Sequence, residues 1–167
     1  NGLDQMLRYQ NMRGHTDEGA ERLFYYNQLS VVTSGESAVL GTYGTPAKYY
    51  QPWKDPYPES DEAIKHALGI DRVRAQERLV HVLFDKQRLL DYIRFFVTYH
   101  DEHNGTKKFI ARYQQYRAVE KALKRIEERK DNGGVVWHTQ GSGKSLTMLF
   151  LARKLRAQKD NPTILLI

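Results

Sequence analysis

The residues best placed to do chemistry form one short loop. It reads His138-Thr139-Gln140-Gly141-Ser142-Gly143-Lys144-Ser145. Glycines let the backbone N–H groups of such a loop approach a phosphate closely, and a following helix adds the positive end of its dipole. A lysine at the position of Lys144 reaches the β- and γ-phosphates, and a hydroxyl at that of Ser145 coordinates Mg²⁺. We therefore predict that residues 139–145 bind a nucleoside triphosphate, namely ATP with Mg²⁺.

One position departs from the usual phosphate-loop pattern. The usual pattern is a glycine, then any four residues, then Gly-Lys-Ser/Thr, whereas this loop opens with His138. A chance Gly-Lys-Ser in an ordinary loop is the alternative interpretation. The apolar segment before the loop and the helical pattern after it favour a phosphate loop instead. Many helicase-like ATPases relax the opening glycine, so His138 favours that branch.

A glutamine lies one predicted helix before the loop. Its segment reads Arg112-Tyr113-Gln114-Gln115-Tyr116-Arg117-Ala118-Val119. A glutamine amide both donates and accepts hydrogen bonds, so it can pair with the N6/N7 edge of adenine. We predict this role for Gln115, because Ala118 and Val119 follow it in the register found in many helicases, and Gln114 is the second candidate. The alternative is that Gln115 faces solvent on a charged helix.

These residues need a strand and helices to position them. The pattern predicts a strand over residues 135–138, a helix over 144–158 and a further buried strand over 163–167. A long charged helix over 113–130 carries Gln115. A strand that leads through a loop and a helix to a second strand is the arrangement of a parallel sheet.

The upstream half reads as a separate part of the fold. A short helix is predicted over 3–13. An extended segment over 23–34 and a strand over 38–43 follow, and the turn Ser34-Gly35-Glu36 joins these two as an antiparallel hairpin. Residues 44–60 hold four of the five prolines, which predicts a loop and a domain boundary. Apolar residues at helical spacing predict helices over 61–103.

Composition narrows the class of protein. Of the 167 residues, 40% are apolar and 28% charged, which suits one packed domain or parts of two. The absence of cysteine excludes disulfides, thiolate metal sites and cysteine nucleophiles. A net charge of +6 favours an anionic binding partner, and nucleic acid is the first candidate. With no signal peptide and no long apolar run, we expect a cytoplasmic protein without membrane association.

The loop and the glutamine segment together resemble one family. The stretches Ala111-Arg112-Tyr113-Gln114-Gln115-Tyr116-Arg117-Ala118-Val119 and Val135-Val136-Trp137-His138-Thr139-Gln140-Gly141-Ser142-Gly143-Lys144-Ser145-Leu146-Thr147-Met148 resemble the restriction (R) subunit of type I restriction–modification enzymes. Residues 27–36 and Trp53-Lys54 are similar to the segment that joins nuclease to motor in that family. The resemblance covers essentially the whole chain and is strongest over 109–148.

The resemblance implies a fold and an activity. Residues 1–58 would be the end of a PD-(D/E)XK-type nuclease domain, 59–104 a helical connector, and 105–167 the start of the first RecA-like lobe of a superfamily 2 motor. In this family the subunit is an ATP-dependent DNA translocase and type I site-specific deoxyribonuclease. It works with methyltransferase and specificity subunits on duplex DNA, and cuts away from an unmethylated recognition site.

The resemblance also singles out Gln5 and Tyr9. Gln-x-x-x-Tyr on a helix resembles a motif that follows the catalytic carboxylates in related nucleases. A spacing of four places both side chains on one helical face. We expect them to bind DNA phosphate or to steady the catalytic lysine, and ordinary helix surface is the alternative.

Two other functions stay open. A superfamily 2 helicase or remodeller without a nuclease would share Gln115 and Lys144 but leave the Gln5/Tyr9 helix unexplained. A non-enzymatic nucleotide-sensing assembly module would bind nucleotide without hydrolysis. The chain begins without methionine and ends in an apolar stretch, so we expect a piece of a longer protein. An acidic Walker B segment and the nuclease carboxylates are not in this sequence, so we expect weak nucleotide binding without hydrolysis or cleavage by these residues alone.

Overall fold

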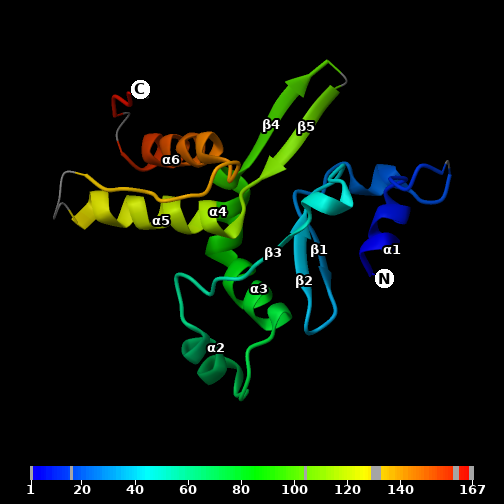
Figure 1. The fold of residues 1–167 in the computed structure, drawn as a ribbon, viewed down its shortest axis with the longest axis horizontal. Coiled ribbons are helices and arrows are strands. Elements are labelled where there is room, and N and C mark those ends of the chain that lie inside the picture. The colour runs from blue at the N-terminus through cyan, green and yellow to red at the C-terminus, as the bar shows by residue number, and fades with distance from the viewer. Residues whose placement is uncertain (1, 16, 104, 129–132, 160–161, 166–167) are drawn as a thin grey trace. The chain divides into compact units, whose positions relative to one another are not determined.

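Short helices and two small antiparallel sheets make up the chain in the computed structural model, so its fold is of the mixed α/β type (Figure 1). The structure describes residues 2–15, 17–103, 105–128, 133–159 and 162–165. The chain divides into two compact units, Asn1–Ile110 and Ala111–Ile167. No helix in the described ranges is long and apolar enough to cross a membrane.

The first unit begins with α1 (Gly2–Tyr9), which is shorter than the predicted helix over 3–13. The helix ends early because Asn11 takes a left-handed backbone conformation with a φ of 54°, and its N–H donates to the carbonyl of Arg8 at 3.0 Å. The predicted extended segment also differs at its start. There η1 (Glu21–Phe24) forms a 3-10 turn, because its N–H groups find carbonyl partners three residues back.

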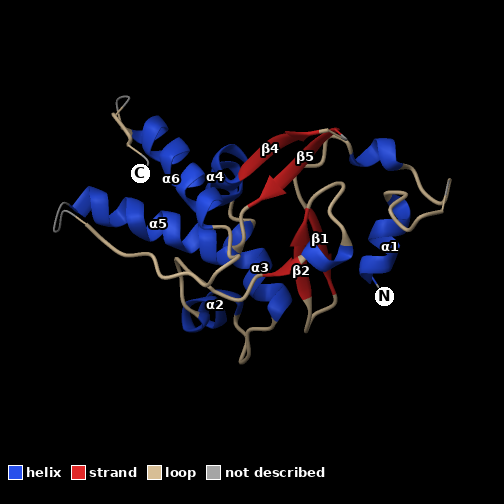
Figure 2. Ribbon diagram, turned by 45° about the horizontal axis from the view of Figure 1, so that its top comes forward, coloured by secondary structure: helices blue, strands red, loops and turns tan. Residues whose placement is uncertain are grey.

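The predicted hairpin is confirmed. β1 (Ser30–Thr33) pairs antiparallel with β2 (Ala38–Gly41), and Val31 lies opposite Leu40. Gly35 in the turn has a φ of 72°, a left-handed conformation that glycine adopts at little cost. β2 ends two residues before the predicted end at residue 43. Figure 2 shows these strands and the second hairpin as separate sheets.

The proline-rich segment 44–60 is more ordered than a plain loop. It contains η2 (Ala47–Tyr49) and the short strand β3 (Gln51–Pro52), which pairs with β2 and completes the sheet order β1-β2-β3. Tyr50 is buried against Gly41, where an added Cβ would lie 2.6 Å from the tyrosine ring. Close packing of an aromatic ring on a glycine therefore holds this segment on the sheet, inside the first unit.

Three helices follow, as the pattern over 61–103 predicted. They are α2 (Asp61–Leu68), α3 (Ala75–Leu83) and α4 (Lys86–Phe96). Side chains cap two of them at the N-terminus. Ser60 Oγ accepts the N–H of Ala63 at 3.1 Å, and Asp85 Oδ1 accepts the N–H of Arg88 at 3.1 Å.

The helical prediction is wrong after Phe96. Here β4 (Val97–Glu102) pairs antiparallel with β5 (Gly105–Ile110). The β4 sequence opens with Val-Thr-Tyr, whose β-branched and aromatic side chains favour a strand over a helix. The predicted boundary between 104 and 105 falls in this hairpin, and the domain assignments of 1–58, 59–104 and 105–167 stay predictions.

An aromatic cluster forms the centre of the first unit. Trp53 meets the edge of Tyr92 with ring centroids 6.0 Å apart, and Tyr92 stacks on Phe96 with centroids 5.6 Å apart. Trp53 is 3% exposed and the other two side chains are fully buried. These contacts join the proline-rich segment to α4, so the apolar surface of both is removed from water together.

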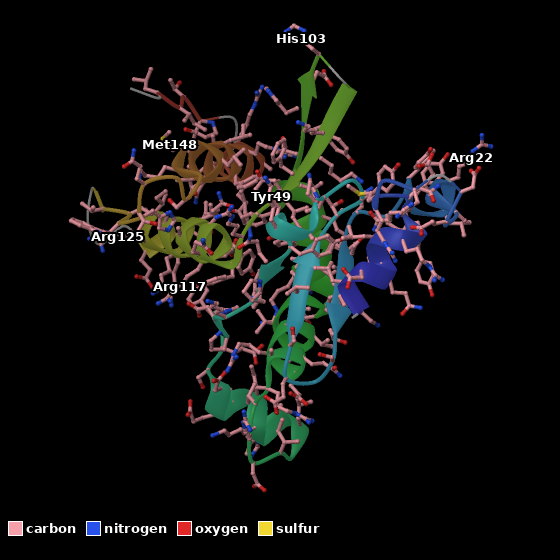
Figure 3. The ribbon with its side chains drawn as sticks, turned by 45° about the vertical axis from the view of Figure 1, so that its right-hand side comes forward. Arg22, Tyr49, His103, Arg117, Arg125 and Met148 are labelled. Atoms are coloured by element: carbon pink, nitrogen blue, oxygen red, sulfur yellow. The ribbon has the colours of Figure 1, made fainter. Side chains whose placement is uncertain are left out.

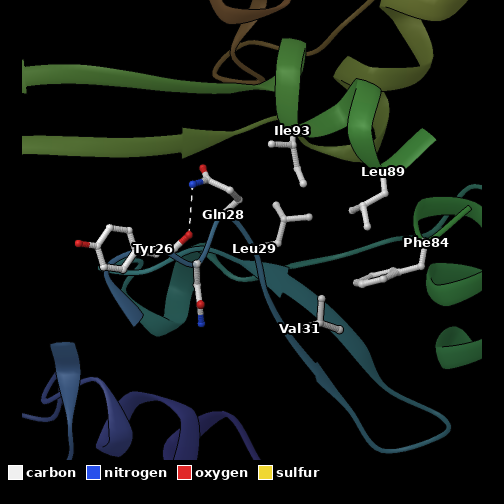
Figure 4. A pocket seen from close by; sticks show the side chains of 8 residues that line it. Tyr26, Gln28, Leu29, Val31, Phe84, Leu89 and Ile93 are labelled. Atoms are coloured by element: carbon white, nitrogen blue, oxygen red, sulfur yellow. Dashed lines mark hydrogen bonds between the residues drawn. The ribbon is translucent and has the colours of Figure 1, made fainter. Parts of the chain in front are cut away.

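An open groove of about 520 Å³ also lies in the first unit (Figure 4). It is lined by Tyr26, Asn27, Gln28, Leu29, Val31, Phe84, Leu89 and Ile93. The β4–β5 hairpin makes hydrogen bonds to polar residues that line this groove. Tyr99 donates its O–H to Gln28 Oε1 at 3.2 Å, and Lys108 Nζ donates to the carbonyl of Asn27 at 2.9 Å.

An ion pair between α2 and α3 predicts a pH-dependent stability. Arg78 donates two hydrogen bonds to the Asp61 carboxylate, at 3.0 and 2.6 Å, and these bonds lower the pKa of Asp61. Because the pKa is lower in the folded state, the pair stabilises the fold above the unfolded pKa of about 4 and this contribution is lost as the pH falls. Asp61→Asn should lower the free energy of unfolding by about 1 kcal/mol at pH 7, since solvent screens a partly exposed pair.

Urea unfolding at pH 7 and pH 3 measures this effect. The difference between wild type and Asp61→Asn should shrink at the lower pH. Asp71→Asn, at an exposed position between the same two helices, is the matched control and should change stability by less than about 0.5 kcal/mol. An equal difference at both pH values would contradict the assignment.

Candidate nucleotide-binding site

Two packed helices frame the predicted loop in the second unit. They are α5 (Tyr113–Glu128) and α6 (Lys144–Gln158), which lie side by side (Figures 1 and 2). The predicted helices at these positions are confirmed within the described residues. Tyr116, Val119 and Leu123 form a buried stripe on α5, and Phe150 of α6 is fully buried. This spacing of three and four residues is that of one helical face.

An ion pair also joins these helices. Lys154 of α6, only 4% exposed, lies 2.5 Å from the Glu120 carboxylate on α5. Arg117 and Arg125, in contrast, extend from the exposed face of α5 (Figure 3). The buried pair and the apolar stripe together fix α6, and therefore the loop that leads into it, against α5.

The predicted strand over 135–138 is absent. These residues make no strand pairing with any described residue, and the side chains of Val135 and Trp137 are 89% and 91% exposed. Residues 162–165 are likewise unpaired, and 166–167 lie outside the described residues. A strand exists only through hydrogen bonds to a neighbouring strand, so an apolar run without such a partner stays irregular. The parallel sheet of a RecA-like lobe is therefore not seen in the described part of the chain.

Two glycines give the loop before α6 an unusual backbone. Gly141 and Gly143 take left-handed conformations with φ of 75° and 80°. Gly143 is the N-cap of α6, so the unpaired N–H groups of the first helical turn open onto the loop. No carboxylate lies in that first turn. The backbone donors and the absence of an acid from the first turn of α6 are compatible with a bound phosphate chain.

The side chain of Lys144 crosses the loop. Its Nζ donates to the carbonyls of His138 and Thr139, both at 3.1 Å. The ammonium group is thus held beside the loop by weakly basic carbonyl oxygens, which a phosphate oxygen can replace as a stronger acceptor. Ser145 is exposed in the first turn of α6, where its hydroxyl is available to Mg²⁺. The roles of Lys144 in phosphate binding and of Ser145 in Mg²⁺ binding stay predictions.

Gln115 lies against the loop, but it is buried rather than exposed. It is 2% exposed, its Oε1 accepts the N–H of Arg112 at 2.8 Å, and its Nε2 donates to the carbonyls of Gly143 at 2.9 Å and Ser142 at 3.4 Å. The alternative of a solvent-facing side chain is therefore wrong. Adenine recognition by Gln115 stays a prediction. The second candidate, Gln114, has a buried Oε1 without a hydrogen-bond partner in the described part of the chain.

Thr147 is a loop contact that the sequence did not single out. Its N–H and its Oγ1 both bond to the carbonyl of Gly143, at 3.1 and 3.2 Å. The signal was available, because a threonine four residues after a helix N-cap can bond back to the N-cap carbonyl.

Gln5 and Tyr9 lie in the first unit, on α1. Gln5 Nε2 donates to the Tyr9 hydroxyl oxygen at 2.6 Å, which confirms that both side chains share one helical face. Tyr9 is 40% exposed. No group of three or more histidine and acidic residues is placed to hold a metal ion among the described residues. The nuclease role of Gln5 and Tyr9 stays a prediction.

This chain is similar to known proteins in both of its units. The sequence model of the SWI2/SNF2 ATPase family matches residues 114–167. The type I restriction enzyme HindI endonuclease subunit of Haemophilus influenzae is 39% identical, over 98% of this chain and 16% of that protein. The putative MjaVIIIP and MjaIXP endonuclease subunits of Methanocaldococcus jannaschii are 34% and 30% identical, over 90% and 83% of this chain.

The chain spans only 16%, 13% and 14% of the lengths of these three relatives. No solved structure is significantly similar to it. The similarity to the Haemophilus influenzae subunit nevertheless runs through both units, and the ATPase match contains residues 138–145 and α6. This chain is therefore a homologue of the endonuclease (R) subunits of type I restriction enzymes.

Proposed function

We propose that the second unit binds Mg²⁺-ATP through the loop before α6. The N–H groups of Gly141 to Ser145 and the Lys144 ammonium would hold the phosphates, and the Ser145 hydroxyl would be a ligand of Mg²⁺. The observation that carries this proposal is the loop geometry, with two left-handed glycines and the Lys144 amine folded over the loop at a helix N-terminus. When bound, Mg²⁺-ATP supplies a phosphoanhydride bond whose hydrolysis can drive mechanical work.

We propose further that this segment belongs to a subunit that translocates duplex DNA and cuts it. Residues 1–58 would end the nuclease domain, with Gln5 and Tyr9 near its site, 59–104 would be the connector, and 105–167 would begin the first motor lobe. The names of the relatives support an endonuclease, and the SWI2/SNF2 match supports a motor. Methyltransferase and specificity subunits would be its partners, and an unmethylated recognition site its signal.

The intact subunit, purified with its partner subunits, tests this function. Circular duplex DNA that carries an unmethylated recognition site should be cut only when ATP and Mg²⁺ are both present. Methylated DNA should neither be cut nor stimulate ATP hydrolysis. Cleavage without ATP would contradict the proposed coupling of motor and nuclease.

A motor without a nuclease is the second candidate, because the SWI2/SNF2 match by itself names only an ATPase. Under that function the same DNA would stimulate ATP hydrolysis, and a third strand bound to the duplex would be displaced, but the duplex would stay intact. The cleavage assay therefore separates the two functions directly.

Removal of the Gln5 amide should separate cleavage from motor activity. If Gln5 and Tyr9 contact DNA phosphate or the nuclease lysine, Gln5→Ala in the intact complex should lower the cleavage rate by about tenfold, the effect of losing one hydrogen bond to a charged group. The rate of DNA-stimulated ATP hydrolysis should be unchanged and serves as the control. An unchanged cleavage rate would mean that the pair is ordinary helix surface.

A further inference from the structure

The hydrogen bonds that the side-chain amide of Gln115 makes with described residues all go to backbone groups. Its Oε1 accepts the N–H of Arg112 at the start of α5, and its Nε2 donates to the carbonyls of Gly143 and Ser142 at 2.9 and 3.4 Å. Only one orientation of the amide satisfies these partners, because the oxygen must face the N–H and the nitrogen must face the carbonyls. Gln115 thus links the N-terminus of α5 to the end of the phosphate loop.

The approach of this side chain depends on a glycine. A Cβ at position 143 would lie 2.5 Å from Gln115 Nε2, so a larger residue there would push the amide away. The φ of 80° at Gly143 is also one that other residues rarely adopt. The loop backbone and the glutamine therefore fit each other closely.

The direction of the two bound carbonyls decides what the loop can bind. In a trans peptide the C=O and N–H groups point in opposite directions. The carbonyl of Gly143 is also held by the N–H and Oγ1 of Thr147, so the contribution specific to Gln115 is at the carbonyl of Ser142. A donor on α5 that holds this carbonyl turns the N–H of Gly143 in the same peptide away from α5. If this peptide rotated, its carbonyl oxygen would face the phosphates and repel them.

We propose that Gln115 is a positioning residue for the phosphate loop, which sets the direction of its peptide groups before nucleotide binds. This inference rests on the proposed phosphate site and assigns Gln115 a different role from adenine recognition. The two N–H bonds of Nε2 already go to the carbonyls of Gly143 and Ser142, so pairing with the N6/N7 edge of adenine would require one of them to break. Gln115 therefore acts on the phosphates through the loop, and its effect does not depend on the base.

Comparison of two ligands that differ only in the nucleoside tests this role. Mg²⁺-ATP and Mg²⁺-tripolyphosphate are titrated into the 167-residue chain and followed by NMR. Gln115→Met, which keeps the length of the side chain but removes both hydrogen bonds, should weaken both ligands by the same factor, about tenfold. A loss confined to ATP would overturn the proposal and assign Gln115 to the base.

A second variant separates the loop contact from the contact with α5. Gln115→Glu keeps an acceptor for the N–H of Arg112 but replaces the donor with an oxygen that faces the carbonyls of Ser142 and Gly143. It should weaken both ligands at least as much as Gln115→Met. Wild-type affinity in Gln115→Glu would show that only the contact with Arg112 matters, and would overturn the proposal.

Two controls make the result decisive. Gln114→Met carries the same change one residue earlier and should leave tripolyphosphate binding within about twofold of wild type. Circular dichroism and the amide spectrum of α6 report whether each variant stays folded. If the wild-type chain binds neither ligand, the phosphate site itself is wrong and this inference fails with it, a result distinct from the ATP-only loss that rejects Gln115 alone.

Discussion

Replacing Lys144 with alanine should weaken the binding of Mg²⁺-ATP by the chain by about tenfold to a hundredfold, the effect of losing one or two hydrogen bonds from a charged donor. Among the described residues, the Lys144 amine donates to the carbonyls of His138 and Thr139, and a phosphate is a much better acceptor for it. In the intact subunit the same change should abolish DNA-stimulated ATP hydrolysis, because the lysine stabilises the phosphate charge that develops in the transition state.

Lys159→Ala is the matched control for this experiment. Lys159 follows the other end of α6, fifteen residues from Lys144, which is about 22 Å along a helix. The two variants lose the same charge, so a general electrostatic effect would weaken ATP binding in both. Only a specific phosphate contact predicts a large loss in Lys144→Ala and almost none in Lys159→Ala. Similar affinities in both variants would remove the basis for the proposed site.

Phe96→Ala should lower the free energy of unfolding of the first unit by about 3–5 kcal/mol. Phe96 is fully buried and stacks on Tyr92, which in turn meets Trp53. Truncation to alanine loses the burial of the ring and leaves a cavity beside Tyr92. Because small proteins are stable by only about 5–15 kcal/mol, the variant should be close to unfolding at room temperature.

Tryptophan fluorescence during urea unfolding measures this effect selectively. Trp53 is 3% exposed and Trp137 is 91% exposed, so the change in fluorescence reports the first unit. Phe84→Ala removes an equal side chain from a site that is 42% exposed and should cost clearly less, under about 2 kcal/mol. Equal losses in the two variants would mean that the aromatic cluster is not the core of this unit.

The sequence by itself determined the features that depend on neighbouring residues. The helices on either side of residues 138–143 were predicted correctly from apolar residues every three or four positions, whereas the phosphate loop, predicted from residue types at fixed spacing, stays a prediction. The hairpin of β1 and β2 followed from β-branched residues on either side of a glycine turn. In each case the interactions that decide the structure lie within a few residues, so a local pattern contains them.

The tertiary structure decided the features that depend on distant partners. The apolar run at 135–138 has no strand partner among the described residues, while Val97 to Glu102 found one in β5 and became a strand instead of a helix. From the sequence, Gln115 could have contacted a base or faced solvent. The structure shows instead that its amide bonds to the N–H of Arg112 and the carbonyl of Gly143. Strand pairing and the burial of a polar side chain are long-range properties, because the groups that satisfy their hydrogen bonds are brought together only when the chain folds.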